Sequence, residues 1–540
     1  MGGSDPLSAE TPSTAMLRGL MPRYLGLDSS TQSLSALVID TDTGRVVLDE
    51  TINFGKELPE FGSPNGFLPN ADALVFHSNP LMWVTAIDRL FSRIKASGFD
   101  FGSIAGISGA GQQHGSVYLR TPITETEPWS ERQELAEQVR PLLSRATSPI
   151  WMDSSTASEC REIAEAVGGD ARVVEITGSR AIERFTGPQI RKFWKTEPAA
   201  YEATREIHLV SSFIASMLAG TSAPIDFGDG AGMNLLDLAK LAWSEPLLRA
   251  TAPQLESRLL APVASNTRVG SIAPYFVHRF GFTAGTGVAA FTGDNPSSLV
   301  GMGATRPGTA VVSLGTSDTV FASMSHARTD PRGFGHVFGN PAGGFMCLIC
   351  FANGSLAREK VKDKVGLDWT GFEKSIVQET KPGNEGALLL PYFVPEMTPK
   401  LLNPTPRLFG DEAFREYREP ARAARAIVEA QALAMQRYSQ FIGEKPTRIL
   451  ATGGASRNAG ILQIIADVFQ AEVRTLEVGN SAALGGALRA ANALGGETFE
   501  SLFERFAAPE PKLSFRPNPN ADYASLRARF EAEVDRLASA

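Results

Sequence analysis

Two hairpin-like patterns of apolar and polar positions recur along the chain. Residues 24–40 (YLGLDSSTQSLSALVID) run from an apolar stretch through six consecutive polar side chains into a second, alternating apolar stretch. Residues 309–324 (TAVVSLGTSDTVFASM) repeat the arrangement with a similar polar tip. Apolar runs that flank a turn in this way predict paired, largely buried strands. A plain hairpin needs only two turn residues, so the long polar tips indicate a function beyond the turn itself.

Between and after these hairpins, strand-like runs alternate with stretches of helical spacing. The pattern predicts helices over residues 81–97, 154–169 and 478–492, and the last, rich in small residues, is expected to pack beside the helix before it. Strand–turn–helix units are predicted over 290–301 and 448–469. This alternation is typical of the α/β class, and a length of 540 residues favours two or more domains.

The two hairpins suggest two related domains. We expect a flexible N-terminal extension over 1–22, a first domain over 23–285, a second over 286–525 and the end of a C-terminal helix over 526–540. Backbone N–H groups in tight turns and hydroxyl groups bind phosphate well. Two tips that face each other across a cleft would therefore form a two-sided phosphate clamp.

Composition narrows the function classes. The net charge is −8 without a basic stripe, which gives no electrostatic case for nucleic acid. No run reaches the roughly 18 apolar residues of a membrane span, and the first twenty residues lack the apolar core of a signal peptide. Three cysteines suit a reducing, cytoplasmic compartment. Cys347 and Cys350 have CxxC spacing inside an apolar run, so we expect them to pack in a buried strand without a zinc or redox role.

Asp28 begins the first polar tip. Its carboxylate can hold Mg²⁺ directly or through water, because magnesium takes oxygen ligands and keeps several waters. A turn in which Asp28 bonds its own backbone is the simpler alternative. Two similar tips in one chain favour phosphate binding. The sequence contains no GxxxxGK[ST] motif, which excludes a P-loop protein.

The glycine-rich stretch GAGQQHG, residues 109–115, follows a predicted buried strand. Its spacing differs by one residue from a dinucleotide-binding fingerprint, and the next residues, SVYLR, predict a strand where that fold requires a helix. A lone His114 would more often be a structural hydrogen-bonding residue. With Gln112 and Gln113 beside it at a strand end, the loop also suits a polyol ligand.

The segment TGDNPSS places Asp294 and Asn295 at a strand-to-helix turn. Both residue types favour the N-cap, and Pro296 suits the first helical position. A carboxylate at a strand end can also accept a proton from a substrate hydroxyl, as the catalytic Asp of kinases does. We expect Asp294 to serve both purposes.

The unit ATGGASRN is a second strand-to-helix turn. Gly453 and Gly454 would let a flat ligand approach the backbone, and Asn458 would lie at the start of the following helix. A simple turn with no ligand is the alternative.

Taken together, the motifs GLDSSTQS, GQQHG, WMDSST, GDN, SLGTSD and ATGGASRN resemble those of the FGGY carbohydrate kinases. The resemblance extends over about residues 24–515 and is strongest to the animal-type branch that acts on D-xylulose. It implies two actin-like (ribonuclease H-like) ATPase domains with the active site in the cleft between them. It also implies ATP-dependent phosphorylation of D-xylulose to D-xylulose 5-phosphate, with Mg²⁺, in a monomer or homodimer.

The resemblance further implies roles for single residues. Asp294 would be the general base, and Asp28 would reach Mg²⁺ through water. The implied sugar contacts are His114, Arg184, Asp294 and Asn295, with Asp153 as a further candidate. The implied contacts to ATP and its phosphates are Asp28, Thr31, Gln32, Gly315, Thr316, Ser317, Trp369, Gly453, Gly454 and Asn458. Without the resemblance, Arg184 would be assigned to the end of a surface helix.

Two alternatives stay open from the sequence. One is another kinase of this family that acts on ribulose, glycerol or a related polyol, because pocket shape decides the sugar. The other is an actin-like ATPase without a sugar substrate. GQQHG and GDN argue against the second, since such a protein has no need of a polyol pocket. Met397 stands where many bacterial members have an arginine, which affects the nucleotide side more than the sugar chemistry.

Overall fold

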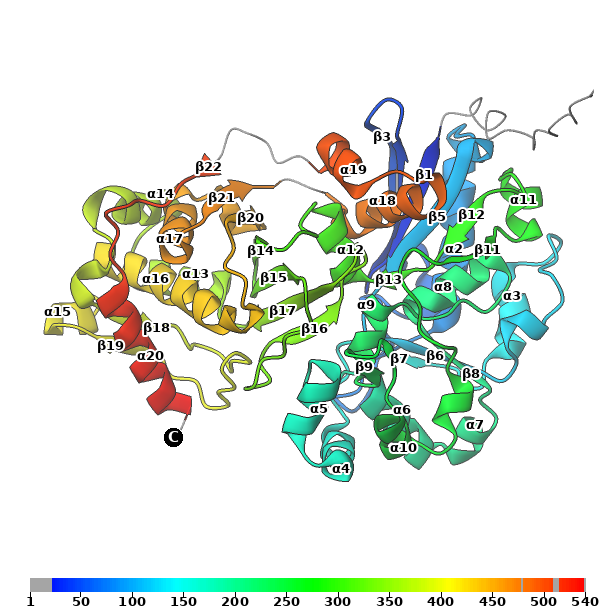
Figure 1. Cartoon of the computed structure of the whole chain (residues 1–540), viewed down its shortest axis with the longest axis horizontal. Coiled ribbons are helices and arrows are strands. Elements are labelled where there is room, and N and C mark those ends of the chain that lie inside the picture. Colours follow the sequence, from blue (N-terminus) through cyan, green and yellow to red (C-terminus); the bar gives the residue numbers. More distant parts are fainter. Residues whose placement is uncertain (1–21, 477–478, 508–513, 539–540) are drawn as a thin grey trace, which may run out of the picture.

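The computed structural model describes residues 22–476, 479–507 and 514–538, so the expected extension over 1–22 lies almost wholly outside the described residues. The chain forms two lobes, each built on a large sheet flanked by helices (Figure 1). The first sheet has the order β11-β12-β5-β1-β2-β3, with β13 paired to β5, and the second has the order β16-β17-β15-β14-β20-β21-β22. The predicted α/β class with two domains is confirmed.

The elements have the following bounds. The strands of the first sheet are β1 (Arg23–Ser29), β2 (Ser33–Asp40), β3 (Arg45–Asn53), β5 (Ile104–Gly111), β11 (Arg268–Ser271), β12 (Gly287–Ala289) and β13 (Thr292–Gly293). Those of the second sheet are β14 (Thr309–Leu314), β15 (Asp318–Met324), β16 (His336–Gly339), β17 (Phe345–Phe351), β20 (Arg448–Thr452), β21 (Glu472–Thr475) and β22 (Ser514–Phe515). The main helices are α2 (Pro80–Ala96), α4 (Ala157–Val167), α5 (Asp170–Thr177), α6 (Thr186–Thr196), α8 (Val210–Ala219), α9 (Phe227–Gly230), α10 (Glu245–Thr251), α11 (Pro274–Phe280), α12 (Asp294–Gly301), α13 (Ser355–Lys364), α14 (Trp369–Lys374), α16 (Pro420–Tyr438), α17 (Ala459–Phe469), α18 (Ser481–Gly495), α19 (Phe499–Phe506) and α20 (Ala524–Ala538).

Both predicted hairpins are present. β1 and β2 pair antiparallel with Leu27 opposite Ala36, and β14 and β15 pair antiparallel with Val312 opposite Val320. The first strand of each hairpin also pairs in parallel with a later strand, β5 for β1 and β20 for β14. The two polar tips therefore occupy equivalent positions, each beside the carboxyl end of a parallel strand in its own lobe.

The predicted helices over 81–97 and 154–169 are confirmed as α2 and α4. Asn79 caps α2 by accepting the N–H of Leu81, and Pro80 occupies the first turn, where its missing N–H has no cost. α4 ends at Gly168 in the left-handed conformation that glycine adopts without strain. Local sequence signals thus determine both helix boundaries.

The expected domain boundary near residue 285 is too early. β12 and β13, over residues 287–293, both pair with β5 in the first sheet. The glycine-rich segment over residues 281–286 is a turn between α11 and β12 within the first lobe. The first lobe therefore continues through α12, and the second sheet starts with β14.

The expectation that the small-residue helix packs beside α17 is wrong. α18 instead lies against β1, β5 and α12 of the first lobe, and α19 follows it there (Figure 1). Small residues make this contact possible: a Cβ on Gly26 would lie 1.8 Å from the carbonyl oxygen of Ala483, and one on Gly485 would lie 1.9 Å from that of Ser297. The buried Arg489 of α18 donates to the carbonyl oxygens of Ala290, at 3.0 Å, and Gly109. α20 then returns to the second lobe, where it packs against α16 and β18 (Leu388–Leu390).

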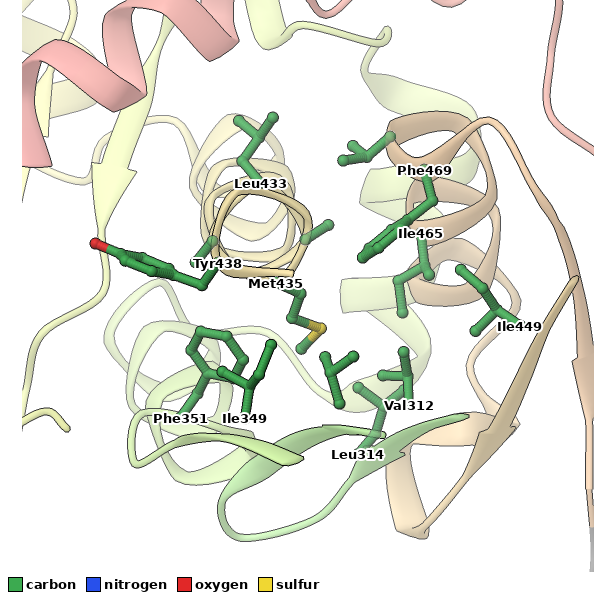
Figure 2. Packing of buried hydrophobic residues seen from close by; sticks show 14 of the residues in the cluster. Val312, Leu314, Ile349, Phe351, Leu433, Met435, Tyr438, Ile449, Ile465 and Phe469 are labelled. Atoms are coloured by element: carbon green, nitrogen blue, oxygen red, sulfur yellow. The ribbon is translucent and has the colours of Figure 1, made fainter. Parts of the chain in front are cut away.

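The core of the second lobe forms where α16 and α17 cover the sheet. Figure 2 shows Met435 and Tyr438 of α16 beside Ile349 and Phe351 of β17. Phe469 of α17 belongs to the same buried cluster. Each such side chain, once buried, contributes roughly 1.5–3 kcal/mol. This packing supports the second polar tip, at the turn between β14 and β15.

Cys347 and Cys350 both lie on β17, and both thiols are free. They are three residues apart on an extended strand, so their side chains point to opposite faces of the sheet. Within the described ranges, no group of three or more histidine, cysteine or acidic side chains could hold a metal ion. No helix there is long and apolar enough to cross a membrane.

The contact between α18 and β1 gives the first prediction. We expect Gly26→Ala to destabilise the protein by about 2 kcal/mol or more, because its Cβ overlaps the backbone of α18 at Ala483 and Ala487. Urea unfolding would measure the change. Gly285→Ala is the matched control, since a Cβ there has no atom within 4 Å. Equal stability of the two variants would contradict this account of the contact.

Candidate active site

Three strand ends of the first sheet meet at one edge and carry the predicted chemistry. In the parallel register, Asp28 lies opposite Ala110, and Thr292 also pairs with Ala110. The loop from Gln112 to His114 follows β5 directly, and Asp294 follows β13 directly. The structure therefore brings Asp28, the loop from Gln112 to His114 and Asp294 to the same edge of the sheet.

Asp28 is held in place by only one contact. Its Oδ2 accepts a hydrogen bond from the Ser30 hydroxyl at 2.7 Å, and its Oδ1 is buried without a partner. Burial raises the pKa of this carboxyl to about 6. The alternative, in which Asp28 bonds its own backbone, does not hold, and an unpaired buried acceptor indicates a site for a ligand.

Asp294 is the first residue of α12, whose N-cap is Gly293. The expectation that Asp294 or Asn295 caps the helix, with Pro296 at its first position, is therefore wrong. The Oδ1 of Asp294 instead accepts from the Asn295 backbone N–H at 2.8 Å and from its side-chain amide at 3.0 Å. Burial and the charge of Asp28 raise the pKa of Asp294 to about 7. This carboxyl can thus take up or release a proton near neutral pH.

The loop after β5 presents amides and a neutral imidazole. Gln113 Oε1 accepts from Asn295 Nδ2 at 2.8 Å, whereas both amide atoms of Gln112 are buried without partners. His114 Nδ1 lies 2.7 Å from the carbonyl oxygen of Gly232, so the proton is assigned to Nδ1. Burial, together with the charge of Arg184, lowers the pKa of His114 to about 3. The uncharged Nε2 is then free to accept a hydrogen bond.

Arg184 lies in the turn before α6, half-buried, and the surface-helix interpretation is wrong. Its guanidinium is 5.8 Å from the ring of Phe185, which stacks on His114 at 4.2 Å. Burial lowers the pKa of Arg184, whereas its electrostatic interaction with Cys350 of the second lobe raises that pKa. Arg184 therefore belongs to the same site as His114, close to the junction of the lobes.

Asp153 does not point to a ligand. Its Oδ2 accepts the backbone N–H of Phe76 at 3.0 Å, and its Oδ1 accepts from Ser155 and from Gln189 Nε2 at 2.8 Å. Because protein donors bind both oxygens of this fully buried carboxylate, it anchors two loops. The candidate sugar contact at Asp153 is not supported by this geometry.

In the second lobe, a cavity of about 880 Å³ lies beside the second tip. Of the predicted nucleotide residues, it is lined by Gly315, Thr316, Trp369, Gly454 and Asn458. Ser317 and Gly453 do not line it. The half-exposed indole of Trp369 offers a flat apolar surface, and the volume suits a small organic ligand.

Gly453 forms the turn next to this cavity. It adopts a φ of +90°, and a Cβ there would lie 2.6 Å from the carbonyl oxygen of Leu314. Asn458 caps α17 by accepting the N–H of Ile461 at 3.0 Å. Glycine at 453 thus permits the sharp turn that places Gly454 and the N-terminus of α17 at the cavity.

Two further side chains of the site were not among the predicted contacts, although Trp151 belongs to the WMDSST motif. Trp151 donates its indole N–H to Thr31 Oγ1 at 2.8 Å and so fixes the first tip, next to the exposed Gln32. Asp229 is fully buried near Asp294, and its Oδ1 has no partner. The motif DFGDG contains Asp229, but only the fold brings it behind the strand edge.

Comparisons with known proteins agree with this arrangement. The N-terminal domain of the FGGY family of carbohydrate kinases matches residues 23–301, and its C-terminal domain matches 310–494. The xylulose kinase of Rattus norvegicus is 42% identical over 525 residues, 95% of this chain and 97% of the relative. Xylulose kinase 2 of Arabidopsis thaliana is 40% identical over 487 residues, 87% of each chain. The crystal structure of xylulose kinase from Bifidobacterium adolescentis has a TM-score of 0.76 at 22% identity, covering 95% of this chain and 99% of that one, and supports the fold.

The raised pKa of Asp294 predicts a cost in stability. A carboxyl whose pKa is higher in the folded than in the unfolded state destabilises the protein when it ionises. The free energy of unfolding therefore falls as the pH rises from the unfolded pKa near 4 to the folded pKa near 7. We therefore expect Asp294→Asn to be more stable than the parent by about 2–4 kcal/mol at pH 8, with the gain nearly gone at pH 4. Denaturant unfolding at both pH values measures this. A gain independent of pH would contradict the burial of an ionisable group there.

Proposed function

This chain belongs to the FGGY family of carbohydrate kinases, and we propose that it transfers the γ-phosphoryl group of ATP to the 5-hydroxyl of D-xylulose. The observation that carries the proposal is the half-buried carboxyl of Asp294, at the strand end beside the loop from Gln112 to His114, where burial and the charge of Asp28 raise its pKa to about 7. The similarity at 40–42% identity to proteins named xylulose kinase supports the choice of sugar.

ATP would bind in the cavity of the second lobe. Its adenine would lie against Trp369 and the turn at Gly454, and its phosphates would extend toward the tip at Gly315–Ser317. The backbone N–H groups and hydroxyls of that tip would bind the β-phosphate. The first tip, with Thr31 and Gln32, would meet the γ-phosphate from the opposite lobe.

The sugar would bind at the edge of the first sheet. His114 Nε2 would accept a sugar hydroxyl, and the side chains of Arg184 and Asn295 would donate to sugar oxygens. The unpartnered amide of Gln112 supports a polar ligand or ordered water there. Closure of the two lobes would exclude water and limit wasteful hydrolysis of ATP.

In the transfer step, Asp294 takes the proton of the 5-hydroxyl while that oxygen forms a bond to the γ-phosphorus. The bond from the γ-phosphorus to the β,γ-bridging oxygen breaks, and ADP leaves. Burial and the charge of Asp28 place the pKa of Asp294 near 7, so the carboxylate is available as a base at physiological pH. Asn295 holds one carboxylate oxygen and leaves the other for the substrate.

Mg²⁺ fits the site as part of Mg·ATP. The unpartnered Oδ1 of Asp28 is an oxygen donor at the first tip, and the described residues include no three-ligand cage for a metal. Asp28 would therefore hold the ion through water, while ATP supplies most of its ligands. The ion would neutralise charge on the phosphate oxygens. A cytoplasmic location and a monomeric or homodimeric state stay predictions.

The proposal is tested by ADP release from Mg·ATP across D-xylulose, L-xylulose, D-ribulose, L-ribulose, glycerol and D-fructose. We expect selective stimulation by D-xylulose. Preference for another polyol would correct the substrate and keep the site. ATP hydrolysis without any effect of sugar would contradict the kinase assignment and favour a nucleotide-dependent switch.

Asp294→Ala provides the control for the same assay. We expect its turnover to fall about 10²–10⁴-fold, because a general base is lost, while ATP affinity stays nearly unchanged. ATP binding by calorimetry separates the two effects. Turnover within a few-fold of the parent would show that Asp294 is not the base.

A further inference from the structure

Asp229 is an acidic side chain close to the base that the proposed mechanism does not use. It lies in α9, where Asp226 accepts its backbone N–H at 2.8 Å. Its carboxyl points toward the turn before α12: a Cβ on Gly293 would lie 2.9 Å from Asp229 Oδ1 and 2.9 Å from Gln113 Nε2. Asp229 and Gln113 therefore enclose the residue that precedes Asp294.

The surroundings of Asp229 disfavour a negative charge. The Ser211 hydroxyl, from α8, lies 2.5 Å from Oδ2, whereas Oδ1 has no partner and the residue is fully buried. The charged groups that act on it are both acidic, Asp226 from its own helix and Asp294 from α12. Adjacent buried carboxyls repel one another when charged, which disfavours ionisation of all of them together.

The hydrogen-bond partners and nearby charges of Asp226 differ from those of Asp229. It accepts the Asp229 N–H and the Ser265 hydroxyl, and the charge of Arg489 on α18 acts on it favourably. Asp229 has a single hydroxyl partner and no such cation. Asp226, the N-cap of α9, therefore has more stabilising partners than Asp229, although burial raises the pKa of both carboxyls.

We propose that Asp229 is a positioning residue for Asp294 that keeps its proton in the folded enzyme. It lies against the Gly293 turn without adding to the charge of Asp28 near the base, so Asp294 can ionise near neutral pH. The role deepens the proposed function and rests on Asp294 as its base. A protonated acid and an amide offer the same donor and acceptor, so asparagine should replace Asp229, and leucine should not.

Kinetics of the full-length enzyme test the role. We expect Asp229→Asn to keep kcat within about threefold and to leave the acid limb of the pH profile of kcat/KM in place. Asp229→Leu should lower kcat at least about tenfold with KM for ATP unchanged. A downward shift of the acid limb by about one unit in Asp229→Asn, or full kcat in Asp229→Leu, would overturn the proposal.

Infrared spectroscopy tests the proton itself, whatever the activity or the folding of the leucine variant. At pH 8, the difference spectrum between the parent and Asp229→Asn should contain the carbonyl stretch of a protonated carboxylic acid. Asp226→Asn is the matched control and should not remove that band. Absence of the band from the Asp229 difference, or its loss in Asp226→Asn alone, would overturn the assignment. A positive infrared result with an inactive sugar assay would refute the proposed function only.

Discussion

The site depends on keeping two half-buried carboxyls, Asp28 and Asp294, at neighbouring strand ends of one sheet. Each group is desolvated, and the charge of Asp28 makes ionisation of Asp294 harder still. The fold accepts this cost in stability because the same effect brings the pKa of Asp294 close to physiological pH. Buried acids elsewhere in the chain have partners: Asp318 pairs with the guanidinium of Arg358 at 2.7 Å.

A rigid frame is required to hold such groups together, and segments from both halves of the chain supply it. α18 packs its small residues directly on β1 and α12, and Arg489 ties the carbonyl oxygens of Gly109 and Ala290. Gly109 precedes the loop from Gln112 to His114, and Ala290 precedes the base Asp294. The last part of the chain therefore fixes the separation of the two strand ends, while the nucleotide cavity stays in the other lobe.

Local sequence was sufficient for most of the elements and for placing several candidate site residues at strand ends. Alternating apolar runs predicted both hairpins, and motifs at strand ends predicted Asp28, His114 and Asp294. Long-range packing was not predictable: α18 docks on the first lobe because two glycines let backbones meet, and no periodicity shows which partner they meet. Asp229 was missed for the same reason, since its role comes from a neighbour 65 positions away that only the sheet brings near. Arg184 was found through family resemblance, and its burial explains why a surface-helix interpretation fails.

The central claim is that an unusually basic carboxyl accepts the proton of the sugar hydroxyl. The most direct measurement is the pH dependence of kcat/KM for D-xylulose with Mg²⁺ in excess, which reports ionisation of the base before the sugar binds. The account predicts that activity falls tenfold per unit below an apparent pKa of about 7, the value for Asp294. A fall of kcat/KM that begins only near pH 4, the ordinary pKa of an exposed aspartate, would contradict the account.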